Sequence, residues 1–192
     1  MRRFTFGPAL TMRGRKNKNL RGLAGKPFHP PLTDVPITAY LFAAAFDVLS
    51  IAVHSSHGVL GRQFYVAGTW TLLGGGAVSL LAALTGWADW HRSSEPGTQA
   101  RRTINAHAIT MITVTVLVLV DIAIRVLGNA DDAYTPAACV VLSVLAGLLV
   151  SMGATLGGSL VYDYGFNVET AGDHPVWHKN ETDVYPGHKS SA

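Results

Sequence analysis

Four stretches of this chain are long and apolar enough to cross a membrane, and no other feature constrains the fold as strongly. A hydrocarbon core about 30 Å thick needs ~20 mostly apolar residues at a helical rise of about 1.5 Å each. Only 14% of the 192 residues are charged, against roughly 25% in an average soluble domain. These windows predict four transmembrane helices, at residues 36–53, 64–87, 104–126 and 137–162.

The connections between these windows are short, so consecutive helices should pack antiparallel. The fold class expected is therefore all-α, an integral membrane four-helix up-down bundle. It divides the chain into a basic arm at 1–27, a transmembrane domain at 28–165 and a tail at 166–192. The basic arm lacks the apolar core of a signal peptide, so we expect it to be retained.

The distribution of basic residues predicts the orientation of the bundle. Eight Lys and Arg precede the first window, three lie between the second and third, and two follow the fourth, which puts thirteen of fifteen on one side. By the positive-inside rule both termini face the cytoplasm. Because the arm adjoins a membrane span and lacks interleaved aromatic residues, it is expected to contact anionic lipid and not nucleic acid.

Polar side chains gather at the predicted cytoplasmic end of the bundle. His29 lies just before the first helix, in "HPPLTDVP", where Thr33 or Asp34 could cap the helix and Pro36 would occupy its first turn. "TGWADWHR" brings Asp89 and Trp90 to the same end, "RRTINAHA" brings His107, and "LGGSLVYDYGFNV" brings Tyr162.

Each of the two histidines has a structural and a ligand interpretation. His29 could cap a helix end at the level of the lipid headgroups, or fold over the bundle and face His107. His107 lies inside an apolar span, where an imidazole needs a partner because an unsatisfied polar group costs several kcal/mol. That partner could be another protein group or a bound cofactor, and the sequence leaves both alternatives open.

Two acids lie deeper in the apolar windows. Asp47 is eleven residues into the first predicted helix, about 16 Å along its axis and so near the middle of the bilayer. A charge there costs roughly 2.5–3.5 kcal/mol, so Asp47 is either a functional residue in the bundle interior or a protonated acid bonded to a neighbouring helix. Asp121 precedes Arg125 by four residues, which predicts a structural ion pair near the outer membrane edge.

Small residues recur at intervals that favour close helix packing. The second window carries "GGG" at 74–76, and the fourth carries Gly147 with Ser151 and Gly153 with Gly157, each pair four residues apart. Such spacing lets membrane helices approach closely. The flat surfaces that result could also make room for a planar cofactor.

From about Gly22 to Val168 the chain resembles an uncharacterised bacterial and archaeal family of four-helix membrane proteins, the domain of unknown function family 2231. The resemblance rests on "HPPLTDVP" followed by Asp47, then "TGWADW", "RRTINAHA" and "LGGSLVYDYGFNV", in that order. It implies a multi-pass protein of the bacterial cytoplasmic (inner) membrane. Some family members are joined to Rieske-type domains, which implies membrane electron transfer. This chain lacks the Cys and His pairs of such a cluster, so any Rieske-type partner would be a separate chain.

Two functions from different classes follow. The first is membrane electron transfer, in which His29 and His107 hold a b-type haem. Asp89 would orient one of these histidines through its second ring nitrogen. Trp90, with Trp87 or Tyr162, would pack beside the haem ring. In a variant, His29 and His107 bind a metal with Asp89, or a quinone head group. The second is a non-catalytic accessory subunit of a larger respiratory or transport complex, or a homo-oligomer. No soluble-enzyme motif is present, so the chain is expected not to be an enzyme by itself.

Overall fold

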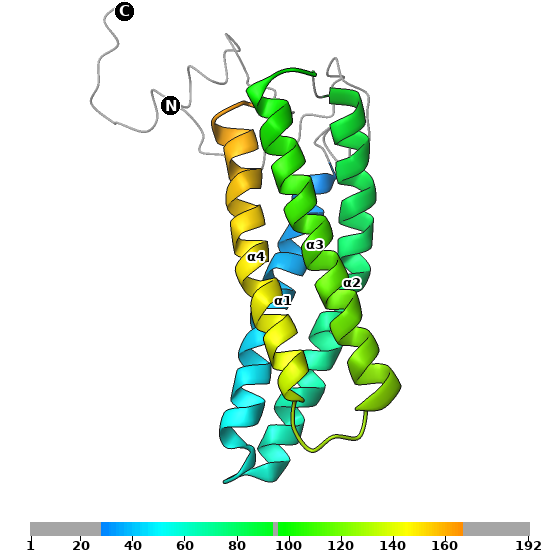
Figure 1. Ribbon diagram of the computed structural model, residues 1–192, viewed down its shortest axis with the longest axis vertical. Helices are drawn as coiled ribbons and strands as arrows, with labels where there is room; N and C mark the ends of the chain where they lie inside the picture. The colour runs from blue at the N-terminus through cyan, green and yellow to red at the C-terminus, as the bar shows by residue number, and fades with distance from the viewer. Residues whose placement is uncertain (1–27, 94–95, 167–192) are drawn as a thin grey trace, which may run out of the picture.

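The computed structural model describes residues 28–93 and 96–166, which form a bundle of four long helices (Figure 1). The predicted basic arm and nearly all of the predicted tail lie outside these residues. The helices are α1 (His29–His54), α2 (Gly58–Ser93), α3 (Gln99–Gly128) and α4 (Ala137–Tyr162). Each is long and apolar enough to cross a membrane, so the predicted four-helix membrane fold is confirmed.

The helices form a ring in which each packs against two neighbours. α1 packs on α2 and α4, and α3 packs on the same two helices, so α1 and α3 face each other across the diagonal of the bundle. α1 and α3 run in the same direction, and both begin at the end where α4 finishes (Figure 1). We call this the proximal end, and the end with the α1–α2 and α3–α4 connections the distal end.

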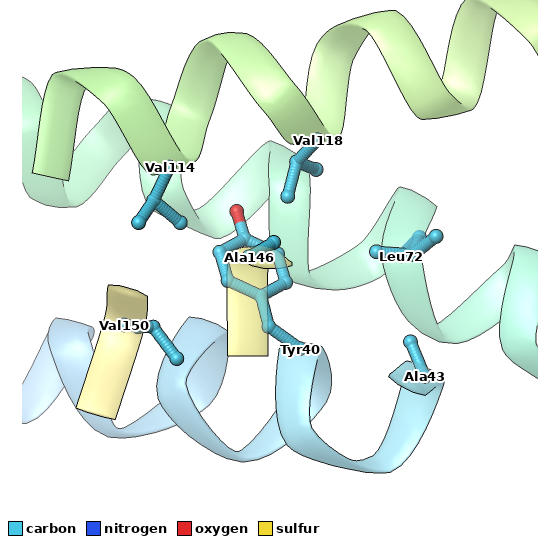
Figure 2. Packing of buried hydrophobic residues seen from close by; sticks show 7 residues of the cluster. All are labelled: Tyr40, Ala43, Leu72, Val114, Val118, Ala146 and Val150. Carbon is cyan, nitrogen blue, oxygen red and sulfur yellow. The ribbon is translucent and has the colours of Figure 1, made fainter. Parts of the chain in front are cut away.

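Tyr40 fills the centre of the bundle. It belongs to a buried apolar cluster made of Tyr40, Ala43, Leu72, Val114, Val118, Ala146 and Val150. Its ring projects from α1 across the core, and its hydroxyl points toward Val114 and Val118 on α3 (Figure 2). The cluster therefore joins all four helices, and burial of its apolar surface stabilises the bundle.

The outer surface of the bundle is apolar on every helix. Large side chains there are well exposed, among them Phe42 on α1, Trp70 on α2, Ile109 on α3 and Leu148 on α4, which are between 55% and 70% exposed. In water such a surface would drive aggregation. In a bilayer the same side chains contact lipid, which agrees with the low charge of the sequence.

The predicted start of the first helix is wrong. α1 begins at His29, seven residues before the predicted Pro36, and Pro36 lies inside the helix. Proline is tolerated in the first turn because the N–H groups there have no helical partner, and Pro30 and Pro31 occupy that turn. The hydroxyl of Thr33 donates to the carbonyl of Pro30 and does not cap the helix. α2 and α3 are also longer than predicted, while α4 has the predicted bounds.

Candidate functional site: two histidines at the proximal end

His29 and His107 lie close together at the proximal end, one on each of the diagonal helices. The centroids of their imidazole rings are 6.3 Å apart and the ring planes are nearly perpendicular, at 83°. His29 reaches this position as the first residue of α1, so it does not have to fold in from a loop. The structure thus brings together the two histidines that the sequence placed at the same end.

Each imidazole is held by a backbone carbonyl of the neighbouring helix. Nδ1 of His29 lies 2.9 Å from the carbonyl oxygen of Ala82 on α2, and Nδ1 of His107 lies 2.8 Å from that of Gly153 on α4. Because a carbonyl oxygen only accepts, both Nδ1 atoms carry the hydrogen and donate. Among the described residues neither Nε2 atom has a hydrogen-bond partner. Both Nε2 lone pairs are therefore available to a ligand.

Two glycines make room for the imidazoles. A Cβ atom added to Gly86 would lie 2.7 Å from Cε1 of His29, and one added to Gly157 would lie 3.2 Å from Cε1 of His107. Each glycine follows the accepting carbonyl by four residues, one turn along the same helix face. Each half of the site therefore consists of a histidine, a carbonyl and a glycine.

Asp89 and Trp90 make contacts other than those predicted for them. Asp89 is buried and near enough to His29 for their charges to interact, yet Nδ1 of His29 donates to Ala82, so a carbonyl orients this ring. Trp90 donates from Nε1 to Asn105 at 2.8 Å, and its ring lies 3.9 Å from the guanidinium carbon of Arg101. Trp90 therefore joins the end of α2 to the start of α3.

The other aromatic residues predicted around the site face outward. Trp87 is 63% exposed and stacks on His91, and Tyr162 is 88% exposed. Over residues 28–93 and 96–166, no three His, Cys, Asp or Glu side chains lie close enough together to hold a metal ion. The proximal site thus contains a pair of imidazoles, with Asp89 near that of His29.

A second polar layer lies near the distal end, and Arg125 is its centre. Arg125 donates from Nη1 and Nη2 to the two carboxylate oxygens of Asp47, at 3.0 and 2.5 Å, and from Nε to Asp121 at 2.8 Å. All three side chains are at most 1% exposed. We call Asp47, Asp121 and Arg125 the distal polar layer.

The predicted pair between Asp121 and Arg125 is present, but its surroundings differ from the prediction. Asp47 also binds Arg125, so the acid expected alone near mid-bilayer is ion-paired across the diagonal. Because α1 starts at His29, Asp47 lies eighteen residues into the helix, about 27 Å along it. The distal polar layer and the histidine pair are therefore near opposite ends of the bundle.

The two polar layers reveal an internal repeat. His29 and Asp47 on α1 are followed 78 positions later by His107 and Arg125 on α3. In space, His29 faces His107 and Asp47 faces Arg125. Equivalent residues of two parallel helices thus meet at two levels, which is the arrangement produced by a pseudo-two-fold axis running along the bundle.

Burial follows the same repeat over both hairpins. Residues 36–49 of α1 and 114–127 of α3 show the same order of buried, half-buried and exposed positions throughout. On α2 and α4, the carbonyls of Ala82 and Gly153 are 71 positions apart, as are Gly86 and Gly157. The hairpin α1–α2 is therefore repeated as α3–α4, and the histidine pair lies on the axis between them.

Reading the sequence alone missed this repeat, because few residues are identical between the hairpins. A signal was nevertheless present, since a histidine precedes a charged residue of the first apolar window and one of the third by eighteen positions in each case. Comparing the windows with each other would have shown that His29 and His107 are equivalent. It would also have paired Asp47 with Arg125.

The fold and its two polar layers define a four-helix integral membrane protein with ionisable residues inside the bundle. The family described as Predicted membrane protein (DUF2231) matches residues 25–170, and the chain belongs to this family. No curated protein and no solved structure matches the chain.

Proposed function

We propose that this protein is a membrane electron-transfer protein that binds a b-type haem between His29 and His107. The observation that carries the proposal is that both Nδ1 atoms are committed to carbonyls of different helices while both Nε2 atoms stay free. Histidines that bind metals usually donate their other ring N–H to such a partner, which fixes the tautomer and the ring orientation.

The two rings are close enough to serve one ligand. Their centroids are 6.3 Å apart and they come from diagonally opposite helices, so His29 and His107 would together hold the iron of a haem.

The residues of the chain would position the iron and keep its ligands rigid. The carbonyls of Ala82 and Gly153 hold the rings, and the two glycines accommodate them. A haem held by the two histidines would supply one-electron transfer. The predicted cytoplasmic orientation would place this site near the cytoplasmic face of a bacterial inner membrane, where a separate redox chain could reach it.

The test is an absorption spectrum of the detergent-purified protein, oxidised and after dithionite reduction, with metal analysis of the same sample. We expect a Soret band, an α band and one haem per chain. His29→Ala and His107→Ala should each lose the haem. His54→Ala is the matched control, because His54 ends α1 at the distal end and stacks on Tyr134.

Other outcomes would overturn the proposal. Haem that remains bound in both proximal variants would rule out these ligands. A stoichiometric metal without haem would indicate a two-histidine metal site, and a colourless, metal-free protein that binds a quinone only when both histidines are present would indicate a quinone site. A colourless protein that copurifies with a larger complex would favour the accessory-subunit function.

A further inference from the structure

The distal polar layer contains one more acid than it contains bases. Two carboxyl groups, Asp47 and Asp121, share the single guanidinium of Arg125, and all three are buried within membrane-spanning helices. If both acids were ionised, this part of the bundle would carry a net charge of −1. An uncompensated charge at such a position is costly, so intramembrane ionisable groups are normally neutralised.

The internal repeat shows which acid is the surplus one. Asp47 and Arg125 are equivalent positions on α1 and α3 and neutralise each other across the axis. The position equivalent to Asp121 is Ala43, which is apolar and buried. Asp121 is therefore a second acid beside Asp47 and Arg125, whose charges already cancel.

The hydrogen bonds lead to the same acid. Both oxygens of Asp47 accept from Arg125, and Oδ1 also accepts from the hydroxyl of Thr135 at 3.1 Å. Asp121 accepts from Nε of Arg125 at 2.8 Å and from Nη2 at 3.3 Å, and the Cys139 thiol lies within its reach. Of the two acids, Asp121 is the one that the guanidinium engages at the longer distances.

The groups that face the layer from the other helices are Tyr65 and Thr69 on α2, Cys139 on α4, and Thr135 from the α3–α4 connection. Arg62 on α2 also lies over the Tyr65 ring, but it donates to the carbonyls of Ala130 and Asp132 and pairs with neither acid in the described part of the chain. Within the described part of the chain, neither acid pairs with another Lys, Arg or His, and no group of three metal-ligating side chains forms. The compensating charge that fits this layer is a proton.

We infer that Asp121 carries a bound proton, which makes the distal polar layer a proton-binding site inside the membrane. The site does not depend on the histidine pair or on haem. Thr135, from the α3–α4 connection at the distal end, donates to Asp47, and the preceding Tyr134 lines a pocket at that end with Ile51 and Asp132.

The test is infrared spectroscopy of the full-length protein, labelled with ¹³C at the aspartate side-chain carboxyl. We expect the carbonyl-stretch band of a protonated carboxylic acid at neutral pH, shifted by the label. Asp121→Asn should abolish the band, and Asp34→Asn, which changes an exposed acid at the proximal end, should preserve it. In labelled Asp121→Glu the band should return at its unlabelled frequency, because the new carboxyl is not an aspartate.

A wild-type protein without a protonated carboxyl band would overturn the inference, as would a band that survives in Asp121→Asn. If sodium in place of a proton balances the charge, the band will be absent and the thermal stability will rise with sodium concentration. Because the labelled wild-type spectrum is informative by itself, the inference remains testable even if Asp121→Asn fails to fold.

Discussion

Asp47 and Arg125 occupy equivalent positions on two parallel helices of a repeated hairpin, and they bind each other across the diagonal of the bundle. If both hairpins carried the same charge at this position, the two charges would repel each other. The two hairpins therefore differ at the position where they meet, and that difference stabilises the pairing of α1 with α3 in one chain.

Removing the guanidinium should destabilise the protein strongly. Arg125→Met leaves Asp47 and Asp121 buried without a partner, and breaking a buried ion pair in this way costs roughly 3–5 kcal/mol of unfolding free energy. Denaturant unfolding in detergent measures the loss. Arg102→Met is the control, since the Arg102 side chain is exposed and, among the described residues, bonds to Gln99.

Replacing all three ionisable side chains should recover most of that stability. In the variant Asp47→Leu, Asp121→Leu, Arg125→Met, no buried charge is left unpaired, and apolar replacements of buried ion pairs are often neutral. If the triple variant is as unstable as Arg125→Met alone, the loss comes from packing and not from unpaired charge.

Tyr40→Phe should raise the stability, and Tyr65→Phe should lower it. The Tyr40 hydroxyl is the one buried side-chain polar atom without a partner in the described part of the chain, and an unsatisfied group of this kind costs about 1–3 kcal/mol. The Tyr65 hydroxyl donates to the carbonyl of Asn129 at 2.8 Å, a bond worth about 1 kcal/mol. Thermal unfolding of both variants in the same detergent compares them, and equal shifts would contradict the assignment.

Gly75→Ala should disrupt the packing of α1 on α2 more than Gly153→Ala disrupts that of α3 on α4. A Cβ at Gly75 would lie 2.6 Å from Cβ of Ala39, an atom that cannot rotate away. A Cβ at Gly153 would meet the sulfur of Met111, the end of a flexible side chain. We expect a loss of about 1–3 kcal/mol for Gly75→Ala and less for Gly153→Ala. Gly74→Ala is the control, because Gly74 has open space around it, and this variant should leave the free energy of unfolding unchanged or raise it.

Gly86→Ala should displace His29 and leave His107 in place. The added methyl group would lie 2.7 Å from the His29 ring, against 3.2 Å for Gly157→Ala and the His107 ring. NMR of ¹⁵N-histidine-labelled protein reports the Nδ1–H tautomer of each ring, with or without a bound cofactor. The His29 signal should change in Gly86→Ala, the His107 signal should change less in Gly157→Ala, and neither should change in Gly74→Ala. An unaltered His29 signal in Gly86→Ala would contradict the proposed fit.

The sequence was enough to predict the membrane class, the four helices and the placement of His29 and His107 at one end of the bundle, but it left open whether they face each other. Apolar windows of this length are typical of membrane-spanning helices. Short connections place consecutive helices side by side. The helix starts were less predictable. Pro36 looked like a first-turn residue, yet the helix continues through it to His29, because the preceding prolines also suit a first turn and packing on α2 supports the added residues.

The partners of the polar side chains were decided only by the tertiary structure. Periodicity along one helix can pair Asp121 with Arg125, but it cannot show that Asp47, on another helix, reaches the same guanidinium. Nor can it show that Ala82 and Gly153 offer their carbonyls to the two histidines, because a carbonyl is present at every residue. The sequence by itself determined which polar groups belong to the apolar helices, since composition and length define those helices. Only the packing of the two hairpins determined which of those groups face one another, because that depends on the rotation and the spacing of helices that are distant in the chain.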